Sequence, residues 1–152
     1  MTQTRLSPHV PSGGSTHLAE GMIGEVLDGG QLVVFRFTNL AAATVDSAAE
    51  AMGALMRRRD EAGQPLRVLL DFSQPDLILM PYVRDQGARL SRLRPRLRGR
   101  VALLALEGTL IATRIDRILR SELYHYRERS LFFRREQALA WLRDTPERGP
   151  LG

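Results

Sequence analysis

Short apolar runs alternate with longer amphipathic segments through most of this chain, and this alternation constrains the fold more than any other feature. Strand-like runs lie at residues 22–27, 32–37, 66–72, 100–106 and 130–133. Helix-like periodicity covers 44–62, a segment from 81 to a stop at Pro95, 108–124 and 134–143. Strands that alternate with helices favour a mostly parallel sheet with right-handed crossovers. We therefore predict an α/β domain of order ββαβαβαβα, with a single mixed, mostly parallel sheet, an N-terminal β-hairpin and four helices.

The two ends of the chain lack this periodicity. Residues 1–20 are rich in Ser, Thr, Pro and Gly, which is typical of a disordered tail, and residues 145–152 contain two prolines and two glycines. The length of 152 residues fits one domain. We therefore expect a domain at 21–144 between two flexible tails. Within it, Asp28-Gly29-Gly30 is expected to join the first two strands, because glycine accepts the positive φ of a tight turn.

Residues suited to catalysis or metal binding are sparse. The chain has no cysteine, which excludes disulfides and thiolate metal sites. His9 and His17 fall in the expected tail, and His125 follows the third helix, where a histidine more often caps the helix than ligates or catalyses. We expect no catalytic residue, no metal site and no cofactor, and hence no enzyme. No segment has the apolar length of a signal peptide or of a bilayer span of ~18 residues, so we expect a cytoplasmic location.

Three short segments carry a resemblance to a known family. They are 68–73 (Val-Leu-Leu-Asp-Phe-Ser), 99–104 (Gly-Arg-Val-Ala-Leu-Leu) and 132–142 (Phe-Phe-Arg-Arg-Glu-Gln-Ala-Leu-Ala-Trp-Leu). Together with the element order, they make residues 21–143 similar to the STAS-like domains of the SpoIIAA-like family and their SEC14-type relatives. The resemblance implies a non-enzymatic regulatory module that binds a protein partner. It also implies an alternative, because the SEC14-type relatives hold a lipid or another apolar ligand.

The phosphorylation switch of this family does not carry over. STAS domains are often switched at a serine near the start of the helix that follows the third strand. The matching residues here are 79–82, Leu-Met-Pro-Tyr, which include no serine. Ser73 is the nearest hydroxyl, and it does not match the position of the family's phosphorylated serine.

Candidate contact residues lie at the end of the strand at 66–72 and just after it, where open α/β sheets place ligand sites. Asp71, Ser73, Asp76, Met80 and Tyr82 are the partner- or ligand-binding candidates in this region. An alternative for Asp71 is that it caps its own loop through backbone N–H groups. Residues 77–80 read Leu-Ile-Leu-Met. Such a run would line a pocket between this loop and the third helix, dock a partner or form a short strand.

All 22 basic residues are arginines, and the formal net charge is +5. Arg84, Arg89 and Arg92 of the second helix complete the candidates, as contacts for an anionic lipid, a small ligand or an acidic partner. A solvated outer face is the alternative. Nucleic acid is not expected, because no aromatic residue interleaves with these arginines. The exclusive use of arginine fits either carboxylate and phosphate recognition or a genome whose base composition favours arginine codons.

Two functions follow from these observations. The first is a STAS-like regulatory module that acts through protein–protein contacts, with a homodimer among the arrangements considered. The second is a protein that binds a lipid or another small apolar or anionic ligand. The pocket beneath residues 77–80 distinguishes them, because only the second function requires it.

Overall fold

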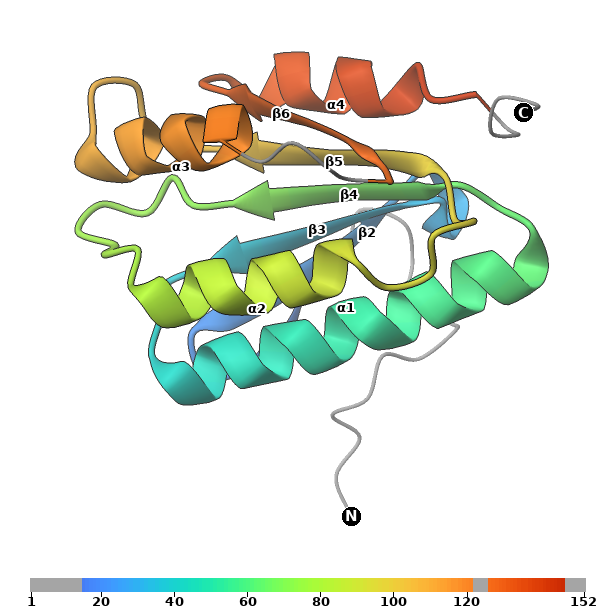
Figure 1. Cartoon of the computed structure of the whole chain (residues 1–152), viewed down its shortest axis with the longest axis horizontal. Coiled ribbons are helices and arrows are strands. Elements are labelled where there is room, and N and C mark those ends of the chain that lie inside the picture. Colours follow the sequence, from blue (N-terminus) through green and yellow to red (C-terminus); the bar gives the residue numbers. More distant parts are fainter. Residues whose placement is uncertain (1–14, 122–125, 147–152) are drawn as a thin grey trace.

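A computed structural model describes residues 15–121 and 126–146, and its centre is one six-stranded sheet (Figure 1). The strands are β1 (Ser15–Ala19), β2 (Met22–Leu27), β3 (Leu32–Phe37), β4 (Leu66–Asp71), β5 (Gly99–Leu104) and β6 (Glu128–Phe132). They lie side by side in the order of the sequence. The first three pair in antiparallel fashion and β3 to β6 are parallel. The predicted α/β class with a single mixed sheet is therefore confirmed.

The described residues form four α-helices, which cover both faces of the sheet. They are α1 (Ala42–Ala62), α2 (Pro81–Ser91), α3 (Leu110–Ser121) and α4 (Arg135–Arg143), and a short 3-10 turn, η1 (Asp28–Gly30), joins β2 to β3. Figure 1 shows α2 alongside α1 on one side of the sheet and α4 on the other. Both glycines of η1 have positive φ, as the predicted tight turn requires.

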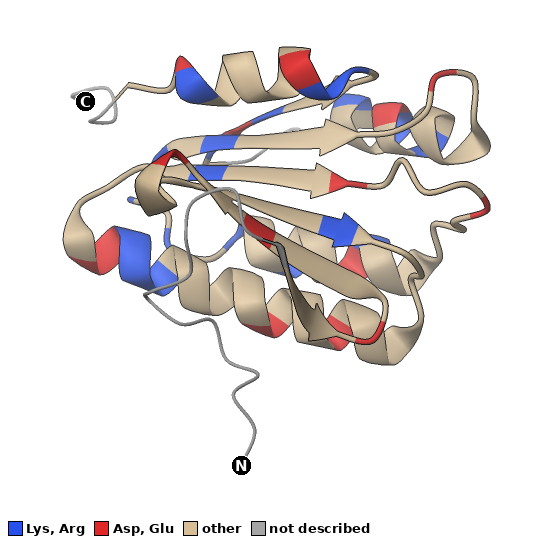
Figure 2. Ribbon diagram, turned by 180° about the vertical axis from the view of Figure 1, so that it is seen from behind, with Lys and Arg blue, Asp and Glu red and all other residues tan. Residues whose placement is uncertain are grey.

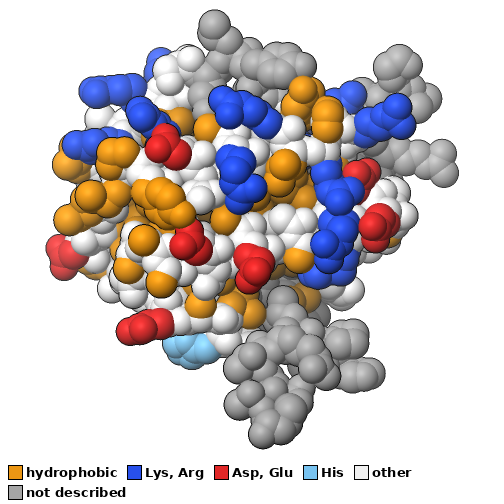
Figure 3. All heavy atoms as spheres, turned by 60° about the horizontal axis from the view of Figure 1, so that its bottom comes forward, with side chains coloured by type: hydrophobic (Ala, Val, Ile, Leu, Met, Phe, Trp, Pro, Cys, Tyr) orange, Lys and Arg blue, Asp and Glu red, His pale blue; other side chains and the backbone are white. Residues whose placement is uncertain are grey.

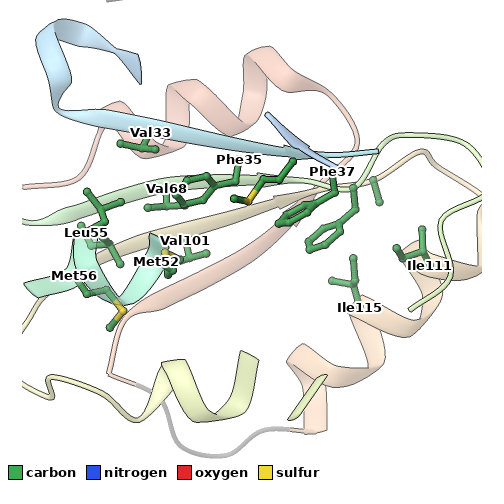
Figure 4. Packing of buried hydrophobic residues seen from close by; sticks show 14 of the residues in the cluster. Val33, Phe35, Phe37, Met52, Leu55, Met56, Val68, Val101, Ile111 and Ile115 are labelled. Carbon is green, nitrogen blue, oxygen red and sulfur yellow. The ribbon is translucent and has the colours of Figure 1, made fainter. Parts of the chain in front are cut away.

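A large apolar core lies between the sheet and the helices α1 and α3 (Figure 4). Alternate residues of each strand point to this face, since successive strand side chains point to opposite sides. Phe35 and Val68 come from the sheet, Met52 and Met56 from α1, and Ile115 from α3, and all five are buried. This core holds three of the four helices to one face.

The opposite face is covered by α4, which packs Ala138 and Leu142 against the sheet. The C-terminal end of α4 lies over two arginines that are register partners on β4 and β5, Arg67 and Arg100. Figure 2 shows basic positions side by side on neighbouring strands of the sheet. Arg67 donates to the Thr145 carbonyl at 2.7 Å, and Arg100 donates to the Trp141 carbonyl at 2.8 Å. Carbonyls at a helix C-terminus have no partner within the helix, so these two arginines have a structural role.

The N-terminal boundary of the domain differs from the predicted one. Residues 1–20 were expected to be a tail, but Ser15–Ala19 form β1, which pairs with β2. The segment has little strand propensity of its own. Its pairing is favoured because Leu18 packs over Gly24 of β2, where a Cβ would lie 2.6 Å from the leucine. Tertiary contact thus overrides local preference, and residues 1–14 lie outside the described part.

The C-terminal boundary is also shifted. The tail was predicted to begin at 145, yet Thr145 is buried and its carbonyl accepts a hydrogen bond from Arg67. Phe133, the residue after β6, is 44% exposed. Trp141 lies only partly buried between Phe132, with ring centroids 5.3 Å apart, and Arg100, which is 4.8 Å from its ring.

The second helix ends at Ser91, earlier than the predicted stop at Pro95. Arg94, the residue before the proline, has a left-handed φ of 50°, and a residue in that position is disfavoured in a helix. Arg96 therefore lies beyond the helix, whereas Arg89 lies within it and Arg92 caps it. No described helix has the length and apolar character needed to cross a bilayer.

Candidate ligand-binding site

A cavity of about 180 Å³ lies between the sheet and the helices α1, α2 and α3. Its floor is formed by inward-facing side chains of β3, β4 and β5, and its walls by apolar side chains of the three helices. The lining includes Leu70 and Leu103 from the sheet, and Val83, Gly87, Leu90 and Ile115 from the helices. Leu79 and Ile118 also line it, so a cavity does occupy the space between the 77–80 segment and the third helix.

The cavity exists because α2 does not pack tightly on the sheet. This helix contains no buried residue, and its helical neighbour is α1. Val83, Gly87 and Leu90 are spaced so that they share one face of the helix, and all three line the cavity. A Cβ at Gly87 would meet no atom within 4 Å outside its own helical turn and chain neighbours. Gly87 is exposed, so this face of α2 borders the part of the cavity that opens to solvent.

Polar contacts hold α2 and its exit to α1 at both ends. The Tyr82 hydroxyl donates to the Asp46 carboxylate near the start of the two helices, and it accepts from Gln86 at 2.9 Å. Beyond the C-terminal end, Arg94 Nη1 donates to the Asp60 carboxylate at 3.0 Å. These contacts fix the helix as a wall of the cavity while leaving its inner face without tight packing.

Arg127 anchors the other end of the α2 segment to β6. The residue is only 6% exposed. Its guanidinium donates to five backbone carbonyls at the end of α2 and in the segment that follows it. Nη1 donates to Arg94 and Leu97, and Nη2 donates to Leu90, Ser91 and Leu93, at 2.9 to 3.4 Å. Burial and the neighbouring arginines lower the pKa of Arg127 from its ordinary value. A lysine could not span these acceptors, because its ammonium is a compact donor.

The charged side chains that line the cavity are arginines, namely Arg84, Arg127 and Arg129. Tyr126, Gln86 and Ser91 are the uncharged polar members, and the described lining contains no carboxylate, imidazole or thiol. Arg127 and Tyr126 stand near the amino-terminal end of the parallel strands, whereas Leu79 and Phe72 stand near the carboxyl end. The cavity is thus mainly apolar, with cationic groups at its edges.

Asp71 stabilises its own loop, as one of the two predictions for it required. The residue is buried, and its Oδ1 accepts from the Ser73 backbone N–H at 2.8 Å and from the Ser73 hydroxyl at 2.6 Å. Asp76 is exposed in the same loop, with a φ of 72°. None of these three residues lines the cavity, so the structure places them beside it.

The remaining predicted residues divide between the cavity and the surface. Arg84 lines the cavity, and it was the only member of the predicted set to do so. Met80 precedes α2 and is 52% exposed. Arg89 donates to the Gln86 side chain at 2.9 Å, and Arg92 is the exposed C-terminal cap of the helix. Sequence reasoning missed Gly87, although a glycine inside an amphipathic helix is a signal of open space or close packing.

A second feature is a group of exposed apolar side chains at one end of the molecule. The six large apolar residues that are most exposed in the described chain follow β4, β5 and β6, which are neighbours in the sheet. They are Ile78, Met80, Tyr82, Leu106, Leu110 and Phe133. Figure 3 shows hydrophobic side chains gathered at the end of the molecule where the loop between β4 and α2 lies in Figure 1. We call these six residues the apolar edge.

No cluster of three or more potential metal-ligating side chains occurs among residues 15–121 and 126–146. His125 lies outside that range, so its predicted capping role is not part of the description. Comparisons of the chain with protein-family models, with curated proteins and with solved structures found no match.

Proposed function

We propose that this protein is a non-enzymatic binding domain that holds a small apolar ligand in the cavity behind α2. The observation that carries the proposal is the cavity itself, about 180 Å³ in volume and lined mainly by aliphatic and aromatic side chains. Interiors of folded proteins are normally packed to crystal-like density. This cavity is partly open to solvent, and an apolar ligand that fills it removes the apolar lining from water.

The volume limits the size of the ligand. A cavity of about 150 Å³ with similar lining holds a benzene molecule, so the larger cavity here suits an apolar group of roughly six to ten carbons. Each methylene removed from water contributes about 0.8 kcal/mol, while association costs at least about 4 kcal/mol. For an eight-carbon chain these figures leave about 2.4 kcal/mol, so we expect weak binding of a simple probe, with a Kd of about 20 mM.

The test is an NMR titration of the full chain with 1-octanol, which detects binding in this range. Amide and methyl shifts are expected to change at residues of α2, α3, β4 and β5 that line the cavity. Gly87→Leu places a side chain in the open space at residue 87 and is expected to abolish these changes. Gly53→Leu, in α1 and outside the lining, is the matched control and is expected to bind like the wild type. Equal octanol binding by both variants would contradict the proposal.

A second candidate function is a STAS-like regulatory module that binds a protein partner, and the apolar edge favours it. Exposed apolar patches rimmed by polar residues often mark interaction sites. The same surface would serve a homodimer. Sedimentation of the wild type and of an Ile78→Asn, Leu110→Asn double variant measures whether a homodimer forms. The two residues suit this test because they are 69% and 67% exposed. A concentration-dependent dimer that the variant loses would support the candidate, and a monomer at all concentrations would count against the homodimer.

Both candidates share the remaining expectations. The proposal includes a cytoplasmic location and no bound cofactor. It also includes no nucleic-acid partner. Membership of the STAS-like family remains part of the proposal and is supported by the element order from β2 to α4, which is the predicted one.

A further inference from the structure

We propose that the natural ligand of the cavity is an amphiphile with a carboxylate head, and that Arg84 binds that head at the mouth of the cavity. This inference rests on the proposed function and adds the chemical class of the ligand. Its basis is the charge of the lining, where three arginines occur among the described residues without a carboxylate.

The three arginines are not equivalent. Arg127 is committed to backbone carbonyls and is almost fully buried, so it fixes the wall. Arg84 lines the cavity and at the same time keeps 58% of its side chain exposed. A charged head at Arg84 can stay partly hydrated while the attached chain is buried. This arrangement avoids the large cost of moving an isolated anion into an apolar interior.

Arg84 is also available to an external anion. Its Nε lies 3.9 Å from the carboxylate of Asp85, which is 70% exposed, and an exposed pair at that distance is weak. Arginine presents a planar pair of donors that matches a carboxylate. The positive end of the α2 dipole is close as well, because Arg84 lies in the first turn of that helix. Charge and geometry at the mouth therefore favour a carboxylate.

The apolar part of such a ligand would extend toward the sheet. Val83 and Leu90 lie on the inward side of α2, and Leu103 and Ile115 face them across the cavity. A chain of about six to ten carbons fits this space by the volume argument above. The ligand class is thus a medium-length aliphatic or aryl-alkyl carboxylic acid.

The test compares three probes with the same chain, 1-octanol, octanoate and octylammonium, by NMR titration at about pH 7, where the carboxylate is ionised. Octanoate is expected to bind the wild type about tenfold more tightly than octanol, because a charge-assisted hydrogen bond is stronger than a neutral one. Octylammonium is expected to bind more weakly than octanol. Arg84→Gln is expected to remove the advantage of octanoate over octanol.

Arg89→Gln is the matched control, because Arg89 is on the same helix but outside the lining. Both variants remove one positive charge, so a general effect of net charge would weaken octanoate equally in both. That result would overturn the role of Arg84. Octanol binding without any preference for octanoate would overturn the ligand class and leave the proposed function intact. Failure of octanol and octanoate alike would overturn the proposed function itself.

Discussion

Replacement of Arg127 by methionine tests how α2 is held in place. The substitution keeps an unbranched side chain but removes the guanidinium that donates to five carbonyls between residues 90 and 97. A hydrogen bond to a charged group contributes about 1.5 to 3 kcal/mol. Five independent bonds would together exceed the stability of many domains, so they cannot be additive. Two nitrogens serve all five acceptors, and burial of the charge offsets part of the gain.

We expect Arg127→Met to lower the free energy of unfolding by about 3 kcal/mol, because several carbonyls lose their donor. Arg127→Lys should lose most of the same stability, since one ammonium cannot reach both ends of the segment. Urea unfolding measures both, with Arg117→Met, at an exposed position of α3, as a control that should change stability by less than about 0.5 kcal/mol. Faster amide exchange in residues 88–97 should accompany the loss. A loss below about 1 kcal/mol in Arg127→Met would refute the anchoring role.

Three further predictions concern the rest of the fold. Gly53→Ala in α1 should raise the free energy of unfolding by about 0.5 to 1 kcal/mol, since a Cβ there meets no atom within 4 Å; a loss would contradict this. Gly99→Ala should lower it by more than about 2 kcal/mol, because its φ is 145° and a Cβ would lie 2.1 Å from the Leu66 carbonyl oxygen; tolerance in thermal unfolding would disprove that clash. The hydrogen bonds that Arg143 donates lower the pKa of the Asp28 carboxyl below its ordinary value of 3.8. The pair should therefore stabilise the fold above about pH 4, by less than about 1 kcal/mol because it is exposed. This contribution should vanish as the pH falls through the lowered pKa, and an equal Asp28→Asn effect at about pH 7 and about pH 2 would oppose it.

The sheet and its helices were largely predictable because their signals are local. Five of the seven residues at 66–72 are apolar, a run typical of a strand covered on both faces. In the structure, α1 to α3 cover one face of β4 and α4 covers the other. Gly63 ends α1 in a left-handed conformation, which a glycine after an amphipathic segment indicates. β1 was missed because its five residues acquire strand structure only by pairing with β2. Periodicity contains no information about such pairing.

The candidate site was predictable only in part. A pocket was one of three alternatives for the apolar run at 77–80, and Leu79 of that run lines the cavity. The individual site residues chosen from that loop lie outside the lining. Polar residues were selected for their chemistry, whereas the cavity is lined mainly by apolar side chains. The role of Arg127 depends on carbonyls 30 to 37 residues away in the sequence, which no local pattern reveals. For Arg67, Arg100 and Arg127, the choice of arginine now has a structural explanation, because each donates to backbone carbonyls that terminate a helix or its exit.

The central claim is that the space behind α2 is a binding site for an apolar ligand. Intermolecular NOEs between 1-octanol and the methyl groups of the protein test it most directly, because they report proximity at individual side chains. The account predicts NOEs to Leu90, Leu103 and Ile115, which line the cavity, and their loss in Gly87→Leu. NOEs confined to Ile78 and Leu110 of the apolar edge would contradict it, since octanol would then bind only the outer surface.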